Sequence, residues 1–121
     1  MAQTPEGKVK EKVKKILKRR GVWFFMPRGT TFGTAGVPDF ICCHEGRLLA
    51  IETKAGGGQP TKLQLNALRS ILNHAGCALV VRETNVDAVE QALDFIERNS
   101  NTALCWRGFD DEEADRQPDT R

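Results

Sequence analysis

Two apolar, β-prone runs, residues 40–43 and 48–51, flank a turn at residues 45–46, and this hairpin pattern constrains the fold more than any other feature. The second turn residue is glycine, which supplies the positive φ that a tight hairpin needs. If the turn is symmetric, paired residue numbers sum to 91 and Asp39 lies opposite Glu52. Directly opposed side chains lie about 4.5–5.5 Å apart at Cβ, where like charges repel. A divalent cation between the two carboxylates would offset that repulsion.

Lys54 follows Glu52 by two residues, so both side chains lie on the same face of one strand. Paired carboxylates can hold Mg²⁺ together with water and phosphate oxygens, and the lysine can orient an attacking water or neutralise developing charge. These are the groups that phosphodiester hydrolysis requires. Other interpretations stay open, because Pro-Asp is common turn chemistry and Glu-x-Lys can be a solvated surface pair. A bulge at Gly46 would shift the register by one residue and separate the acids.

The composition is that of one soluble globular domain, with 121 residues, 40% apolar and 28% charged. No apolar run approaches the roughly 20 residues of a membrane span, and the lysine-rich N-terminus lacks the apolar core of a secretory signal. We therefore expect a cytoplasmic protein without a membrane partner. The four cysteines form no C-x-x-C pattern, so they predict buried free thiols in a reducing compartment rather than a zinc site. Cys42 and Cys43 are adjacent on a strand and should point to opposite faces.

Charge is distributed unevenly along the chain. Between Lys8 and Arg20 there are eight basic residues and one acid, whereas residues 110–115 are almost purely acidic. A basic helix face binds phosphate backbones through counterion release, although a solvated lysine-rich face fits equally well. The candidate nucleic-acid-binding residues are Lys8, Lys12, Lys15, Arg19, Arg28 and Lys62. We expect a single domain over residues 1–108 and an acidic, disordered tail over residues 109–121.

The first helix is predicted to begin at Thr4 with proline at its first position and to end at Gly21. Glu6 lies on its apolar stripe, so this carboxylate either points into a site or complements the helix dipole. The apolar stripe of this first helix consists of Val9, Val13, Ile16 and Leu17. Residues 22–26 predict a strand whose three aromatic residues we expect mostly in the core. Residues 28–36 form a loop rich in glycine and threonine, which is a candidate functional loop.

The second half of the chain predicts a parallel crossover. A helix over residues 61–75, with Gly76 just past its end, leads directly into a strand at residues 77–81. Gln64 lies beside the apolar stripe of this helix; its amide either bonds to the acidic pair or Lys54, or reaches solvent. Thr84 or Asn85 is expected to cap a last helix, and residues 103–106 to add an edge strand or dock on the core. The order αβββαβα predicts an α/β fold with a mixed sheet and helices on both faces.

The ordered set of motifs resembles the PD-(D/E)xK nuclease superfamily, in which an acid after proline precedes E-x-K on the next strand of an αβββαβ core. The chain is most similar to the VRR-NUC branch, and within it to small standalone, virus-encoded members. The positions that carry the resemblance are Glu6, Gly36-Val37-Pro38-Asp39, Gly46-Arg47, Glu52-Thr53-Lys54, Gly56 to Gly58, and Gln64. It spans roughly residues 4–98, and the adjacent cysteines at 42 and 43 are unusual for it.

The resemblance implies a restriction-endonuclease-like fold and a Mg²⁺- or Mn²⁺-dependent endodeoxyribonuclease, similar to Holliday-junction resolvases that act as homodimers. It implies that Asp39, Glu52, the Thr53 carbonyl and Glu6 hold the metal, that Lys54 activates the nucleophile, and that Gln64 braces the site. Branched or duplex DNA is the expected partner, without an organic cofactor. Two symmetric cuts need two such chains. The alternatives are a repair or restriction-like nuclease acting on flaps, nicks or duplex, and a nucleic-acid-binding module without chemistry.

Overall fold

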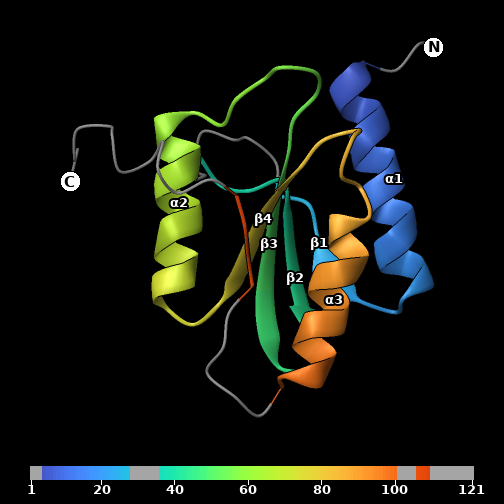
Figure 1. Ribbon diagram of the computed structural model, residues 1–121, viewed down its shortest axis with the longest axis vertical. Helices are drawn as coiled ribbons and strands as arrows, with labels where there is room; N and C mark the ends of the chain where they lie inside the picture. The colour runs from blue at the N-terminus through green and yellow to red at the C-terminus, as the bar shows by residue number, and fades with distance from the viewer. Residues whose placement is uncertain (1–3, 28–35, 101–105, 110–121) are drawn as a thin grey trace.

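The computed structural model describes residues 4–27, 36–100 and 106–109, which form a five-stranded sheet between helices (Figure 1). The elements in chain order are α1 (Pro5–Arg19), β1 (Trp23–Phe25), β2 (Phe40–His44), β3 (Arg47–Thr53), α2 (Lys62–Asn73), β4 (Cys77–Val81), α3 (Ala88–Arg98) and β5 (Arg107–Gly108). The strands lie side by side in the order β1-β2-β3-β4-β5, with the first three antiparallel and β3, β4 and β5 parallel. The predicted mixed α/β fold is confirmed at this level.

The β2–β3 hairpin has the regular register that the sequence predicts. Phe40 pairs with Ile51, and His44 pairs with Arg47. The two turn residues both have positive φ, 50° at position 45 and 75° at position 46, as a two-residue hairpin turn requires. The alternative with a bulge is therefore wrong. One residue beyond the Phe40–Ile51 pair, the same register sets Asp39 opposite Glu52.

The helix ends follow from their capping residues. The Thr4 hydroxyl accepts a hydrogen bond from the Gly7 N–H at 3.0 Å, and the chain leaves α1 through Gly21 at φ 67°, as predicted. Helix α2 ends at Asn73, two residues earlier than expected. The residue with left-handed backbone after this helix is Ala75, at φ 68°. The sequence predicts Gly76 for this role.

One face of the sheet, here termed the closed face, is covered by α1 and α3 (Figure 1). Its buried apolar side chains include Val9, Val13 and Leu17 of α1, Leu49, Ile51 and Leu79 of the sheet, and Val89, Leu93 and Ile96 of α3. Arg20, just after α1, joins the two helices at their surface by donating to Glu90 at 2.7 Å and to Asp94 at 2.9 Å. This face therefore combines a continuous apolar core with a rim of ion pairs.

The opposite face, here termed the open face, is covered in the described part of the chain by α2, which packs over β3 and β4, and by Phe109 (Figure 1). Beyond α2 this face is exposed, with Trp23 at 62%, Phe25 at 48% and Leu48 at 39%. The expectation that the aromatic residues of β1 lie mostly in the core is therefore wrong, since only Phe24 packs against the closed-face core. A crossover helix covers the strands that it connects, and β1 and β2 lie outside that connection.

Three further differences concern α3, the C-terminal strand and the cysteines. Helix α3 begins after Asp87, which makes no side-chain cap, so neither Thr84 nor Asn85 caps it. Strand β5 lies at residues 107–108, and residues 103–105 of the expected edge strand lie outside the described ranges. Cys42 and Cys77 are buried free thiols as predicted, whereas Cys43 is exposed.

None of the helices in the described ranges is long and apolar enough to span a membrane.

Candidate active site

The segment before β2 places Asp39 by packing against the first turn of α2. Gly36 has φ 85°, and a Cβ at this position would lie 2.5 Å from the Leu63 carbonyl oxygen. Only glycine permits this approach, because any other residue would clash with backbone and strain its own φ. Pro38 is buried next, and Asp39 follows it directly at the start of the strand. The Gly-x-Pro-Asp sequence thus fixes the carboxylate at one end of the sheet.

Asp39 is held by the neighbouring strand. Its Oδ2 accepts hydrogen bonds from the Thr53 backbone N–H at 2.9 Å and from the Thr53 hydroxyl at 2.8 Å. Its Oδ1 lies 3.5 Å from Nζ of Lys10, a residue of α1. One oxygen is therefore committed to orienting the side chain, and the other faces a positive charge at the mouth of the site.

Glu52 is buried beside Asp39 with only 2% of its surface exposed. Its Oε2 lies 3.7 Å from Nζ of Lys54, and its Oε1 is buried without a hydrogen-bond partner in the described ranges. Burial, and then the charge of Asp39, raise the pKa of Glu52 to about 8, whereas Lys54 acts in the opposite direction. A buried carboxylate oxygen without a partner is costly, and such an atom in a folded protein calls for an explanation such as an ion.

The two acids fit a hard divalent cation. Within the described residues only Oδ2 of Asp39 accepts hydrogen bonds, whereas Oδ1 of Asp39 and Oε2 of Glu52 each face an ammonium group, at 3.5 and 3.7 Å, and Oε1 of Glu52 has no partner. Mg²⁺ is typically held by one or two carboxylates, with water and phosphate oxygens completing its coordination. In the residues that the structure describes, no group of three or more His, Cys, Asp or Glu side chains gathers to hold a metal. The pair would therefore leave most coordination positions to water and substrate. The role of the Thr53 carbonyl stays a prediction.

Glu6 reaches the site through Lys10, a residue that the sequence does not single out. The Glu6 carboxylate and the Asp39 carboxylate both lie 3.5 Å from the same Lys10 Nζ. The charge of Glu6 also contributes to the raised pKa of Glu52. The signal that was open to sequence reasoning is the four-residue spacing of Glu6 and Lys10, which makes them neighbours on a helix.

Gln64 serves a different purpose from the expected one. Its Oε1 accepts a hydrogen bond from the Thr61 N–H at 2.8 Å, while its own N–H donates to the Thr61 hydroxyl at 3.2 Å. This reciprocal capping box stabilises the start of α2. The expected contact of the Gln64 amide with the acidic pair or Lys54 is absent within the described ranges. Gln64 shapes the turn that Gly36 rests against, rather than the acids themselves.

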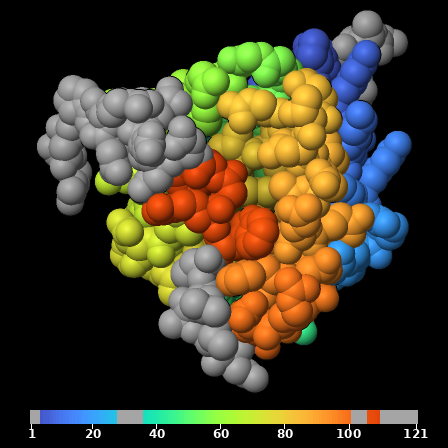
Figure 2. Space-filling model, in the orientation of Figure 1, coloured from blue at the N-terminus to red at the C-terminus, as the bar shows by residue number. Residues whose placement is uncertain are grey.

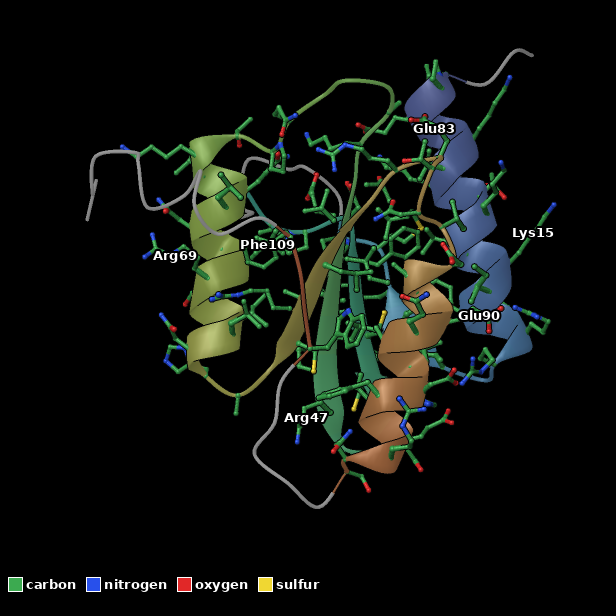
Figure 3. All side chains as sticks on the ribbon, viewed as in Figure 1. Lys15, Arg47, Arg69, Glu83, Glu90 and Phe109 are labelled. Carbon is green, nitrogen blue, oxygen red and sulfur yellow. The ribbon has the colours of Figure 1, made fainter. Side chains whose placement is uncertain are left out.

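The candidate nucleic-acid-binding residues fall into three groups. Lys8, Lys12 and Lys15 are exposed along α1, and Figure 3 shows Lys15 pointing away from the sheet. Arg19 donates to Glu90, so its charge is already paired within the chain. Lys62 is half-buried at the start of α2, and Arg28 lies outside the described ranges.

Asp39, Glu52 and Lys54 thus meet at one end of the sheet, where β2 begins and β3 ends. Two carboxylates that can bind a hard cation, beside an ammonium group, can hold and polarise a phosphate ester. Comparisons with protein-family models, with curated proteins and with solved structures find no match to this chain.

Proposed function

We propose that this protein is a Mg²⁺- or Mn²⁺-dependent DNA endonuclease that hydrolyses phosphodiester bonds, acting on branched DNA as a homodimer. The observation that carries the proposal is Glu52, a buried carboxylate with an unpartnered oxygen next to a second carboxylate. A site under selection for stability alone would favour an apolar residue there, since a buried carboxylate oxygen without a hydrogen-bond partner opposes folding. The order α1-β1-β2-β3-α2-β4, which is that of a PD-(D/E)xK core, adds support.

Each residue of the site then has a definite task. A bound cation would supply an activated water and neutralise charge on the phosphate. Asp39, oriented by Thr53, and Glu52 would hold it through the oxygens that the chain leaves uncommitted. Glu52 would give up its proton as the cation binds, because metal ligands bind in their deprotonated form. Lys54, near the Glu52 carboxylate, would orient the attacking water or bind a phosphate oxygen.

The remaining parts of the proposal concern substrate and assembly. Lys8, Lys12 and Lys15 offer exposed positive charge to the phosphate backbone of DNA. One chain carries one acidic pair, so two symmetric cuts in a four-way junction require two chains. Sedimentation with and without a four-way junction tests the homodimer directly.

Cleavage of labelled four-way junction, flap and linear duplex, in Mg²⁺, Mn²⁺ or EDTA, tests the proposal. We expect metal-dependent, symmetric nicks near the crossover of the junction. Asp39→Asn and Glu52→Gln should lose cutting while still binding DNA, and Lys54→Ala should cut about 100- to 1,000-fold more slowly. Glu11→Gln and Lys14→Ala are matched controls, because this pair lies on α1 and is separate from the site.

The other outcomes separate the alternatives. Equal cutting of flap and duplex would favour a repair or restriction-like nuclease. DNA binding without cutting in either metal would leave a binding module. Cutting in EDTA, or wild-type cutting by Glu52→Gln, would overturn the role of the acidic pair.

A further inference from the structure

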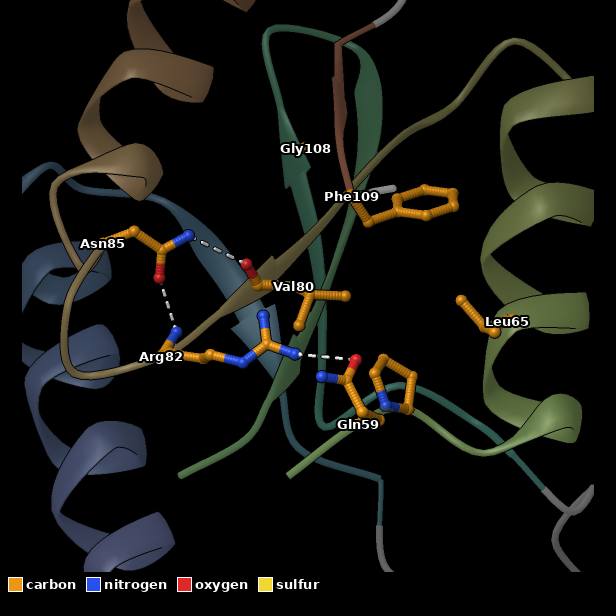
Figure 4. A pocket seen from close by; sticks show the side chains of 8 residues that line it. Gln59, Leu65, Val80, Arg82, Asn85, Gly108 and Phe109 are labelled. Atoms are coloured by element: carbon orange, nitrogen blue, oxygen red, sulfur yellow. Dashed lines mark hydrogen bonds between the residues drawn. The ribbon is translucent and has the colours of Figure 1, made fainter. Parts of the chain in front are cut away.

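A pocket of about 320 Å³ lies between α2, the carboxyl end of β4 and β5 (Figure 4). Its lining includes Gln59, Leu65, Val80, Arg82, Asn85 and Phe109. This volume falls at the lower end of the range for small-molecule sites, about 300–1,000 Å³. In the space-filling view, residues 106–109 reach the surface between α2 and α3 (Figure 2). The pocket is therefore large enough for a flat group of the size of a nucleobase.

The pocket lies next to the acidic pair, linked to it by Val80 and by the loop before α2. Val80 pairs with Glu52 across the parallel β3–β4 ladder, so their side chains lie on the same face of neighbouring strands, which run about 4.8 Å apart. Gly58 precedes Gln59 of the lining in the loop before α2, and its carbonyl accepts a hydrogen bond from Arg82 Nη2 at 3.0 Å. A Cβ on Gly58 would lie 3.9 Å from Cδ of Lys54, so the lysine runs along the same loop. A group in the pocket would thus be the immediate neighbour of a phosphate at the acids.

The side chains of the pocket combine apolar walls with hydrogen-bonding groups. Leu65, Val80 and the ring of Phe109 supply apolar surface (Figure 4). The Arg107 guanidinium lies 5.7 Å from the centroid of the Phe109 ring and adds positive charge beside it. No acidic residue is among the described residues that line the pocket. An anionic, aromatic ligand fits this environment better than a cation or a peptide carboxamide.

Two polar side chains face into the pocket from its loop side (Figure 4). Gln59 is exposed, and its Oε1 accepts a long hydrogen bond of 3.4 Å from Arg82 Nη2. Within the described ranges, all hydrogen bonds of the Arg82 guanidinium come from that one nitrogen, which leaves further donors for a ligand. Asn85 is committed, because it accepts from the Arg82 N–H at 2.6 Å and donates to the Val80 carbonyl at 3.2 Å. Asn85 therefore fixes the shape of the pocket, and Gln59 and Arg82 provide its recognition groups.

We propose that this pocket binds an unpaired nucleobase next to the scissile phosphate, with Phe109 stacking on the base and Gln59 and Arg82 contacting its edge. Stacking on an aromatic side chain combined with hydrogen bonds to the base edge is how proteins recognise unpaired bases. A paired base inside a duplex cannot enter such a pocket without leaving its stack. The inference rests on the proposed nuclease function and specifies its substrate as branched DNA in which a nucleotide at the branch point is unpaired or unpairs on binding.

An abasic scan, read as binding in EDTA, tests this inference without any cleavage. The probe is a fluorescent duplex with a three-nucleotide single-stranded flap, in which one unpaired nucleotide at a time is made abasic. The full-length protein should lose about 5- to 100-fold in affinity at one flap position, as expected for one lost base–aromatic stack. Phe109→Leu keeps an apolar side chain against the open-face core, so it should fold normally. This variant should bind the intact flap as weakly as the wild type binds the abasic flap. Removing the base should not weaken its binding further.

Three controls sharpen the result. Phe109→Trp should bind the intact flap with the affinity of the wild type, unlike Phe109→Leu, because tryptophan keeps an aromatic face. Gln59→Ala changes an exposed side chain and should weaken the preference for the intact flap with no change in unfolding temperature. Trp23→Leu alters an exposed aromatic residue on β1, outside the pocket, and should keep the wild-type preference.

Two results would overturn the inference. If no abasic position lowers the affinity, or if Phe109→Leu retains the full response to the abasic site, the pocket does not bind a base. The nuclease proposal would survive that outcome, since metal-dependent cutting is measured separately. If the wild-type protein binds none of these DNAs, the inference and the proposed function both fail.

Discussion

The two faces of one sheet differ in what their side chains do. Along β3, Leu49 and Ile51 point into the closed face and join its apolar core, whereas Ala50 and Glu52 point into the open face. The closed face is sealed by two helices with ion pairs along their rim. Among the described residues, the open face has one helix, a pocket, exposed aromatic residues, and a buried acid with an unpartnered oxygen.

This difference teaches how a small domain can contain an unfavourable group. A buried carboxylate opposes folding, and the apolar contacts of the closed face are available to offset it. We therefore expect substitutions on the closed face to lower stability, and substitution of Glu52 to raise stability or leave it unchanged while removing function.

Leu79→Ala should produce the largest effect on stability. Leu79 is fully buried in the closed-face core, so its truncation should lower the free energy of unfolding by about 2–5 kcal/mol. Leu63→Ala is the matched control, because that leucine is 52% exposed and should change the stability little. Urea denaturation of both variants measures the difference. Similar losses in the two variants would contradict the distinction between a packed core and an exposed surface.

Glu52→Gln should have the opposite sign. The pKa of Glu52 is about 8 in the folded protein and 4.5 for an ordinary glutamate. Between these pH values the folded state keeps a proton that the unfolded chain has lost, so the stability of the metal-free wild type should fall as the pH rises from 4.5 to 8. The glutamine variant should lack this component of the decline and gain on the order of 1–3 kcal/mol at pH 8.

Unfolding of both proteins in EDTA across this pH range checks the prediction. Glu11→Gln serves as the control, because that acid is exposed on α1 and should not alter the pH profile. A Glu52→Gln variant that is less stable than the wild type at pH 8 would mean that the carboxylate stabilises the fold.

Replacing Lys12 and Lys15 together by alanine should weaken DNA binding without a measurable loss of stability. Both side chains are exposed on α1, so the variant should reduce the slope of log affinity against log salt by about 2. Affinity titrations at several salt concentrations measure the slope. An unchanged slope would show that this helix face is merely solvated.

Trp23→Ser should have the smallest effect on the fold. Its side chain is 62% exposed on an edge strand, so the unfolding temperature should change by no more than about 3 °C. A larger decrease would mean that the open face is covered in solution. Sedimentation of the same variant would then show whether a second copy of the chain provides that cover.

The sequence predicts the local parts of this architecture well. The turn at Gly46 determines the hairpin register, and therefore the position of Asp39 opposite Glu52, because both depend on neighbouring residues. The start of α1 at Thr4 and the crossover from β3 to β4 follow from equally local signals.

The parts that the sequence predicts poorly depend on tertiary packing. Whether Trp23 is buried depends on which strands α2 covers, and an apolar residue gives the same signal in either case. Lys10 enters the site only because α1 lies against the start of β2. Gln64 satisfies its own helix cap, a local alternative that competes with any contact to the acids. Phe109, which the sequence assigns to the tail, packs against the open-face core.

Calorimetric titration of Mn²⁺ at pH 7, in buffers of different ionisation enthalpy, tests the central claim most directly. If Asp39 and Glu52 form a cation site in which Glu52 is protonated beforehand, the wild type should bind the metal and release about one proton. Glu52→Gln should show neither effect, and Glu11→Gln should show both. Absence of binding even with DNA present, or binding without proton release that persists in Glu52→Gln, would contradict the account.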